Sequence, residues 1–275
     1  MIFLFRLSLA LVVLLLGGCE QSPAPALDQQ LYIWQRQWTK AHEPALRQSH
    51  GDFSNLRVLA LQAFPGAGWS RARINPVLLK ADGRPLIAVV RLDGQLKALE
   101  QDEVIAQIQQ VLGDWQAQGL TPAGVEIDHD AGNVRLPAYG TFLGQLRQVL
   151  PANLRLSITA LPAWLDSPAL PGLLETVDSS VLQVHAVSDP RQGLFDPKQA
   201  RHWAQRWSDV TTRPFYLALP AYGVALLTQE SGAPWWKAKC RSIAVASGGS
   251  CWPIRNKWPG LRQICVPIRR NISLG

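Results

Sequence analysis

Short apolar segments alternate with amphipathic segments along most of this chain, and this alternation limits the folds open to it. Leu56–Phe64 and Pro85–Arg91 are largely apolar, which is typical of strands buried on both faces. Residues 104–115 instead carry apolar side chains at helical spacing, after acidic residues that suit a helix N-terminus. Strands that are separated by single helices predict parallel βαβ units.

Seven predicted strands favour an α/β fold with a (β/α)8 TIM-type barrel, which commonly takes about 250 residues. An open doubly wound sheet is the main alternative, but no glycine-rich phosphate loop follows the first strand. The eighth strand would lie near Ser242–Ala246 or be absent, so the barrel is expected to be irregular or incomplete at its C-terminus. The seven strands are Leu31–Trp38, Leu56–Phe64, Pro85–Arg91, Gly124–Asp130, Leu154–Leu161, Ser180–Val187 and Pro214–Tyr222.

The first residues are typical of a bacterial lipoprotein signal peptide. Arg6 precedes the mostly apolar run Leu7–Leu16, which is roughly half as long as a membrane-spanning helix. Leu16-Gly17-Gly18-Cys19 matches the lipobox, in which the cysteine is lipidated. We therefore expect a signal peptide at 1–18, a lipidated tether at 19–30, and membrane anchoring through acyl chains such as palmitate on Cys19. Glu20 weakly favours the outer membrane of the cell envelope, facing the periplasm; an ordinary secretory signal is the alternative.

The positive charge of the chain is confined to its last segment. Residues 237–275 contain eight Lys or Arg and no Asp or Glu, whereas the barrel body at 31–236 is close to neutral. The sequence therefore gives no sign of a nucleic-acid surface. The tail also holds Cys240, Cys251 and Cys265, of which one would stay unpaired. It is either a basic, disulfide-bearing surface segment or the product of a frameshifted or truncated reading frame, and we slightly favour the second.

The predicted strand Gly124–Asp130 carries three carboxylates on one face. Glu126, Asp128 and Asp130 point the same way because side chains alternate along a strand. Their mutual repulsion is expected to raise the pKa of one of them, as a general acid needs near neutral pH. We interpret Asp130 as the proton donor and Asp128 as its electrostatic partner or substrate orienter. The alternative is a structural network with Arg91 or another base inside the barrel.

This strand resembles the strand-four motif of the family-18 chitinase-like glycoside hydrolases, in which alternate Asp residues end in a catalytic Glu. The resemblance implies a general acid at Asp130, an Asp that orients the substrate's acetamido group at Asp128, and the first ladder position at Glu126. It is compatible with substrate-assisted hydrolysis, in which that acetamido group is the nucleophile. Asp130 is one methylene shorter than Glu, and His129 replaces the usual aromatic residue, so the identity of the sugar stays open.

Three further stretches resemble a bacterial family of lipoprotein-type proteins that has a predicted glycosidase-like barrel and no assigned function. This resemblance implies fold more than activity. The stretches are Trp34-Gln35-Arg36, Ser157–Pro162 with Trp164, and Gln183–Ala186.

Several other residues near the ends of the predicted strands are candidates for substrate binding. Gln183 could hydrogen-bond a sugar hydroxyl and His185 could pair with an acidic group, while Arg91 could contact either substrate or carboxylates. Flat aromatic platforms for sugar rings are the second kind of candidate, with plain packing as the alternative. A divalent cation held by the carboxylates and His185 is a weaker alternative, since no zinc-motif spacing is present. The aromatic candidates are Trp34, Trp69, Trp164 and Tyr222.

These observations predict a cell-envelope lipoprotein with a glycosidase-like barrel that hydrolyses a glycan, such as peptidoglycan or a surface polysaccharide, by carboxylate acid/base catalysis. The alternative is a non-catalytic glycan-binding or envelope-interaction lipoprotein that has the barrel without the chemistry. Neither reading calls for a cofactor or a nucleic-acid partner.

Overall fold

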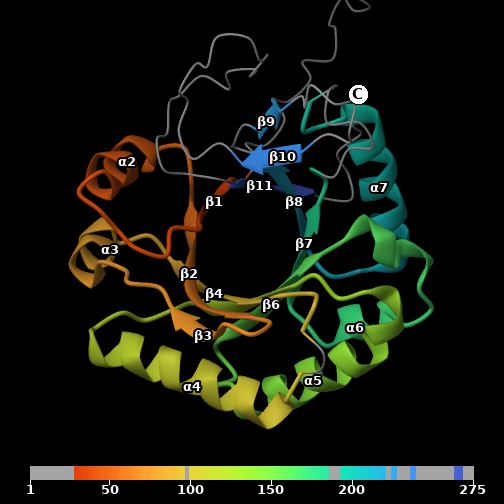
Figure 1. Ribbon diagram of the computed structural model, residues 1–275, viewed down its shortest axis with the longest axis horizontal. Helices are drawn as coiled ribbons and strands as arrows, with labels where there is room; N and C mark the ends of the chain where they lie inside the picture. Colours follow the sequence, from red (N-terminus) through yellow and green to blue (C-terminus); the bar gives the residue numbers. More distant parts are fainter. Residues whose placement is uncertain are drawn as a thin grey trace, which may run out of the picture.

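The computed structural model describes residues 28–96, 99–185 and 193–220, together with the backbone of three strands further along the chain. Figure 1 looks down a ring of strands, with the helices arranged around its outside. The predicted eighth strand near Ser242–Ala246, the three tail cysteine side chains, Tyr222 and Cys19 lie outside this description. No helix within the described ranges is long and apolar enough to cross a membrane.

Seven strands pair side by side in parallel in the ring, which confirms the predicted α/β barrel class. An eighth strand, β11 (Gln263–Ile268), closes the ring by pairing with both β8 and β1. It runs antiparallel to both neighbours, so the barrel is irregular at its C-terminus, as expected. The parallel strands are β1 (Gln30–Ile33), β2 (Asn55–Phe64), β4 (Leu86–Leu92), β5 (Gly124–His129), β6 (Arg155–Ala160), β7 (Ser179–Gln183) and β8 (Phe215–Pro220).

The helices cover the outer face of the ring (Figure 1). Two of them begin at clear caps: the Asn75 side chain accepts a hydrogen bond from the Leu78 amide, and the Asp196 carboxylate accepts from the amides of Lys198 and Gln199. Proline occupies the first turn of both helices, where its missing N–H costs nothing. The helices are α2 (His42–Ser49), α3 (Pro76–Asp82), α4 (Gln101–Ala117), α5 (Leu136–Val149), α6 (Leu170–Glu175) and α7 (Pro197–Val210), with short 3-10 turns η1 (Asn133–Arg135) and η2 (Pro162–Asp166).

A short strand that the sequence pattern did not reveal, β3 (Gly68–Arg71), folds back on β2 as an antiparallel hairpin. Its Trp69 indole donates to the Glu103 carboxylate at 2.6 Å, and Arg71 forms an ion pair with Asp114. These contacts hold the hairpin against α4. Further along the chain, β9 (Val224–Leu227) and β10 (Trp236–Lys239) form a separate two-stranded antiparallel sheet.

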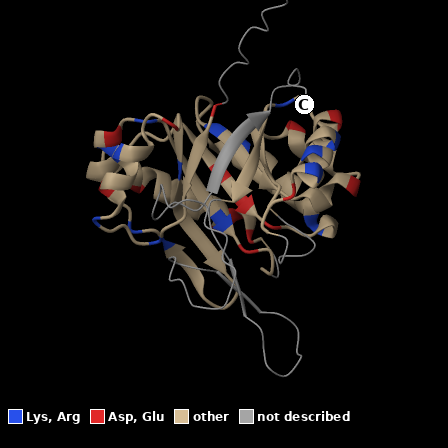
Figure 2. Ribbon diagram, turned by 90° about the horizontal axis from the view of Figure 1, so that it is seen from above, with Lys and Arg blue, Asp and Glu red and all other residues tan. Residues whose placement is uncertain are grey.

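Buried hydrophobic side chains form two clusters, one between strands and helices and one inside the ring. Leu31 and Val90 belong to the larger cluster, whereas Tyr32 and Val89 belong to the smaller one. Because neighbouring residues of a strand face opposite sides, the smaller cluster lies in the interior of the barrel. It occupies only part of that interior. Figure 2 shows acidic and basic positions at the centre of the barrel, in addition to those on the outer helices.

Candidate active site

The lowest carboxylate of the acidic face, Glu126, is fully buried in a network of polar side chains. The Tyr32 hydroxyl donates to it at 2.5 Å and the Ser157 hydroxyl at 3.2 Å. Arg57 forms an ion pair with the same carboxylate, while the Nε atom of Arg57 donates to the Gln30 side-chain oxygen at 2.9 Å. Every group in this network has a partner and none opens to solvent, so Glu126 cannot touch a substrate directly.

Asp128 lies one step higher on β5 and is also buried, but its partners differ. It accepts hydrogen bonds from the Thr159 hydroxyl at 2.6 Å and from Arg91 Nη1 at 2.8 Å. The Gln183 amide nitrogen lies 3.4 Å from Asp128 Oδ1, the oxygen that also accepts from Thr159. Arg91 and Thr159 lie on β4 and β6, the two strands next to β5, and Arg91 is in register with Asp128. Gln183 lies on β7, one strand beyond β6.

Asp130 follows the end of β5, at the carboxyl end of the strands, where barrel enzymes place their chemistry. Its side chain is 37% exposed. Arg91 Nη2 lies 3.5 Å from one carboxylate oxygen, and the Gln183 amide nitrogen lies 3.4 Å from the other. Arg91 and Gln183 therefore each contact both Asp128 and Asp130. The two carboxylates consequently lie within two hydrogen-bond lengths of each other.

The raised pKa expected on this face belongs to Asp128. Burial raises the pKa of Asp128 to about 6, and the negative charges of Asp130 and Glu126 add to this rise. The Arg91 guanidinium and the Thr159 hydroxyl act in the opposite direction. Repulsion between carboxylates, the cause expected from the sequence, is thus secondary to loss of water around a fully enclosed group.

An aromatic stack supports Arg91 from the side of β1. The Trp34 ring lies parallel to the Tyr32 ring at 5.3 Å, and the Arg91 guanidinium carbon lies 5.7 Å from the centre of the Trp34 ring. This distance allows a cation–π contact. Trp34 is only partly buried, and it lies beside the arginine that pairs with both Asp128 and Asp130.

The structure separates the remaining candidates. His185 is half-buried and lies two residues beyond the end of β7. Trp164 is a correction: it is fully buried, and its indole nitrogen donates to the Ala131 carbonyl at 2.7 Å. It therefore has no free face for a sugar ring. Trp69 contacts α4 from the β3 hairpin, outside the strand ring.

Sequence reasoning missed Arg57, Tyr32, Ser157 and Thr159, which hold the carboxylates in place. Arg57 had a visible signal, because it is the one charged residue in the apolar run of β2. A charged residue is rarely fully buried unless it is paired. The hydroxyl residues gave no such signal, since Ser and Thr are common on strands of any orientation.

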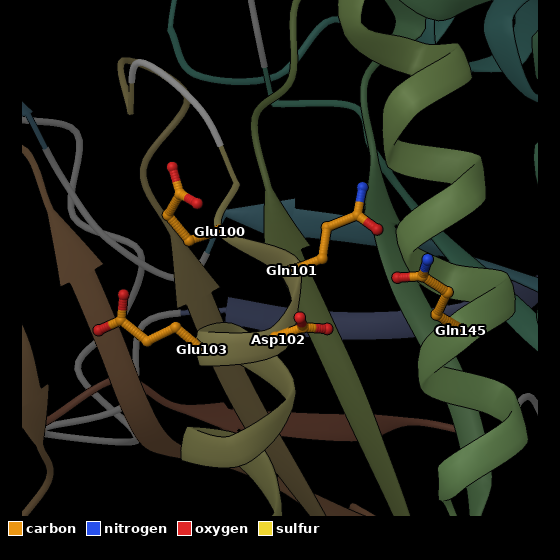
Figure 3. A pocket seen from close by; sticks show the side chains of 5 residues that line it. All are labelled: Glu100, Gln101, Asp102, Glu103 and Gln145. Atoms are coloured by element: carbon orange, nitrogen blue, oxygen red, sulfur yellow. The ribbon is translucent and has the colours of Figure 1, made fainter.

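A pocket with a volume of about 500 Å³ lies on the outside of the barrel, between the first turn of α4 and the side of α5. Figure 3 shows its lining, in which carboxylates from α4 stand with two amide side chains. It is unconnected with the carboxylates on β5. Within the described ranges, no three His, Cys, Asp or Glu side chains gather in a way that could hold a metal ion. The lining residues are Glu100, Gln101, Asp102, Glu103 and Gln145.

A family model described as a domain of unknown function, DUF3142, matches residues 82–237, more than half of the chain. The chain belongs to the DUF3142 family. The matched segment contains Arg91, the whole of β5 and Gln183, so the two carboxylates and both donors that span them lie within it. No curated protein matches the chain by sequence.

Several solved structures share the fold. The spore cortex-lytic enzyme SleL of Bacillus cereus has a TM-score of 0.61 at 13% identity, covering 88% of this chain and 65% of that chain. The Bacillus megaterium enzyme of the same name has a TM-score of 0.58 at 12% identity, covering 89% and 66%. A GH18 chitinase of Flavobacterium johnsoniae has a TM-score of 0.51 at 13% identity, covering 72% and 70%. The chain thus spans slightly less than two thirds of either cortex-lytic enzyme.

At such low identity, these similarities show a TIM-type barrel and nothing about activity. The fold implied by the resemblance of the acidic strand to family-18 hydrolases is therefore confirmed.

Proposed function

We propose that this protein hydrolyses a glycan at the carboxyl end of its barrel, with Asp130 protonating the leaving-group oxygen. The observation that carries the proposal is the pairing of Asp130 with Asp128. Asp130 is the one member of the acidic face that is open to solvent, and it stands beside a buried carboxyl group with a pKa of about 6. Two carboxyl groups in unlike environments are the usual arrangement for glycosidic acid/base catalysis.

Asp128 would act through its charge. It is enclosed by Thr159, Arg91 and Gln183, so it cannot approach a sugar carbon as a nucleophile. Above its pKa of about 6 Asp128 is ionised, and its negative charge then stabilises positive charge that develops on the sugar ring in the transition state. The nucleophile then comes from a water molecule or from the acetamido group of the substrate itself. No cofactor takes part in either route.

The choice of a glycan rests on the neighbours of the site and on the relatives of the fold. Gln183 contacts both carboxylates and Trp34 lies beside Arg91, so the site offers a polar group and an aromatic face, as sugar sites require; His185 and Tyr222 are further candidates. The structures with similar folds are named as chitinases and spore cortex-lytic enzymes. Anchoring through a lipidated Cys19 in the cell envelope, also part of this proposal, would bring peptidoglycan or a surface polysaccharide within reach.

A panel of aryl glycosides and purified envelope glycans, incubated with the full chain, tests the proposal. We expect Asp130→Asn to lower kcat/KM by about 10²–10⁴-fold, because a general acid contributes that much. Asp128→Asn should lower it as well. Asp114→Asn, which neutralises an exposed carboxylate on α4, is the matched control and should keep full activity. Turnover that survives in Asp130→Asn would contradict the assignment of the acid.

One observation favours a second function, glycan binding without catalysis. Arg91 already forms ion pairs with both Asp128 and Asp130, so part of their negative charge is compensated before any substrate binds. A binding protein would retain glycans on an affinity column and release them unchanged. Glycan retention by the wild type with no product over the whole panel would select this second function.

A further inference from the structure

The loops that follow β4 and β5 touch backbone to backbone, at Gly94 and Asp130. A Cβ atom on Gly94 would overlap the main-chain oxygen of Asp130, and it would lie 3.0 Å from the Asp130 carbonyl carbon and 3.2 Å from its Cβ. Gly94 does not have a positive φ. The position therefore needs glycine because there is no space for a side chain, and the backbone conformation itself would accept other residues.

Three hydrogen bonds fix these loops around that point of contact. The His129 Nδ1 atom donates to the Leu92 carbonyl at 3.0 Å, just before the two residues in contact. Beyond them, Arg135 donates to the carbonyls of Gly94 at 3.2 Å and Leu96 at 2.5 Å. The close approach thus lies between tethers on both sides, so it is a fixed feature of this end of the barrel.

The contacts of the Asp130 side chain restrain its carboxylate only weakly. Its contacts with Arg91 and Gln183 are 3.5 and 3.4 Å long, and its side chain is more than one third exposed. Contacts of this length are at the limit for hydrogen bonds and restrain a side chain poorly. Its main chain must therefore supply most of the restraint. The next residue is held as well, because the buried Trp164 indole donates to the Ala131 carbonyl.

We infer that Gly94 is a positioning residue, which sets the place of the Asp130 carboxylate relative to Asp128 through direct contact between the two backbones. The consequence for catalysis rests on the proposed glycan hydrolysis; the positioning itself does not. A methyl group at position 94 must push the Asp130 peptide away or move its own loop. Displacement of a catalytic group by about 1 Å can cost about 100-fold in rate.

Three glycine variants of the full chain separate positioning from general destabilisation. Gly94→Ala introduces the clash at Asp130. Gly132→Ala changes the same loop, but nothing lies within 4 Å of its Cβ position. Gly124→Ala introduces a clash of a similar kind at the other end of β5, since its Cβ would lie 2.8 Å from the Arg155 main-chain oxygen. Protein labelled with ¹³C at aspartate carboxyl groups reports the resonance and titration midpoint of Asp130, and glycan turnover reports kcat and KM.

We expect Gly94→Ala to move the Asp130 resonance and its midpoint, and to lower kcat about 10- to 100-fold with little change in KM. Gly132→Ala should leave all of these unchanged. Gly124→Ala should lower the Tm while the Asp130 resonance stays in place. If Gly94→Ala does not fold, Arg135→Ala is the test instead. It removes the hydrogen bonds that the exposed Arg135 side chain donates to Gly94 and Leu96, and it should move the Asp130 resonance by a smaller amount.

An Asp130 resonance and midpoint that stay at their wild-type values in the folded Gly94→Ala variant would overturn the inference, as would equal shifts in Gly94→Ala and Gly124→Ala. For Arg135→Ala, used when Gly94→Ala is unfolded, an unmoved resonance has the same meaning. Failure of the proposed function is a separate result. A wild type that cleaves no glycan would refute the hydrolase, while the resonance of Asp130 would still decide the role of Gly94.

Discussion

The two arginines inside the barrel form chemically similar ion pairs with β5, but they differ in their access to solvent. Arg57 and Glu126 are 1% and 0% exposed. Arg91 and Asp130 are 32% and 37% exposed, and Asp130 lies four residues beyond Glu126, just after the end of β5. The lower layer, Arg57 with Glu126, can only stabilise one arrangement of the strands. The upper layer, Arg91 with Asp128 and Asp130, can exchange partners with a ligand. The position of a carboxylate along the barrel axis, more than its residue type, decides here whether it is buried in the structure or can contact a substrate.

The energetic consequences of the two environments also differ. Removing one partner of a buried ion pair leaves an uncompensated charge without water, which costs about 3–5 kcal/mol. An exposed or half-exposed pair is screened by solvent and contributes about 0–1 kcal/mol. Changing Glu126 and Asp130 one at a time and measuring the stability of each variant therefore tests this difference.

The largest effect on stability is expected from Glu126→Gln, which leaves the buried Arg57 guanidinium without its counter-charge. The free energy of unfolding, measured with urea, should fall by about 3–5 kcal/mol. Asp130→Asn makes the same chemical change at the open end and should lower it by less than about 1 kcal/mol. Equal losses in the two variants would show that the two layers are not energetically distinct.

The next effect is a pH dependence that comes from Asp128. Its pKa in the folded chain is about 6, above its ordinary value of 3.8, so the folded state binds a proton that the unfolded state releases. The stabilisation is complete below pH 4 and is lost as the pH rises through 6. A shift of this size corresponds to about 3 kcal/mol.

Two buried histidines act in the opposite direction, so the measurement must be a difference. Burial lowers the pKa of His42 and His129, and each therefore destabilises the fold as the pH falls below about 6.5. The free energy of unfolding of the wild type should be compared with that of Asp128→Asn at pH 4, 5, 6 and 7. The difference should fall by about 2–3 kcal/mol over this range. A constant difference would mean that Asp128 titrates alike in both states.

A smaller effect is expected when the upper arginine is removed. Arg91→Gln should raise the pKa of Asp128 further, since the guanidinium is the largest influence that lowers it. At pH 8 the variant should lose about 1–2 kcal/mol of stability. At pH 5 the loss should nearly vanish, because a protonated Asp128 needs no counter-charge. Arg91→Lys keeps the charge and is the control; a loss that is the same at pH 5 and pH 8 would contradict this account.

The barrel and the shared face of the three carboxylates could be predicted from the sequence, because both follow from fixed repeats of the backbone. Apolar strands between single helices predict parallel pairing, and alternation places Glu126, Asp128 and Asp130 together. The contact with Arg91, anticipated as part of a structural network, is present. These features follow from the order of strands and helices and from the alternation of side chains along a strand, which do not depend on the details of tertiary packing.

Other features depend on contacts between distant segments, which no local pattern encodes. Trp164 is near a strand end, but only the packing of η2 shows that its ring turns into the core. The direction of β11 and the β3 hairpin are likewise set by tertiary pairing. An Asp-Gly pair such as Asp93-Gly94 is typical of a turn, and the structure has a turn there, but the close approach of Gly94 to Asp130 comes from a tertiary contact.

The smallest effect tests whether the two layers are connected. Trp34 stacks on Tyr32 of the lower layer and lies beside Arg91 of the upper one. A double-mutant cycle of Trp34→Leu and Arg91→Gln should give a coupling energy of about 0.5–1 kcal/mol, the usual size of a cation–π contact. The control cycle pairs Trp34→Leu with Arg71→Gln, which lies outside the strand ring, and should give none. If both cycles give zero, Trp34 does not restrain Arg91, and the upper layer owes its geometry to β4, β5 and Gln183 alone.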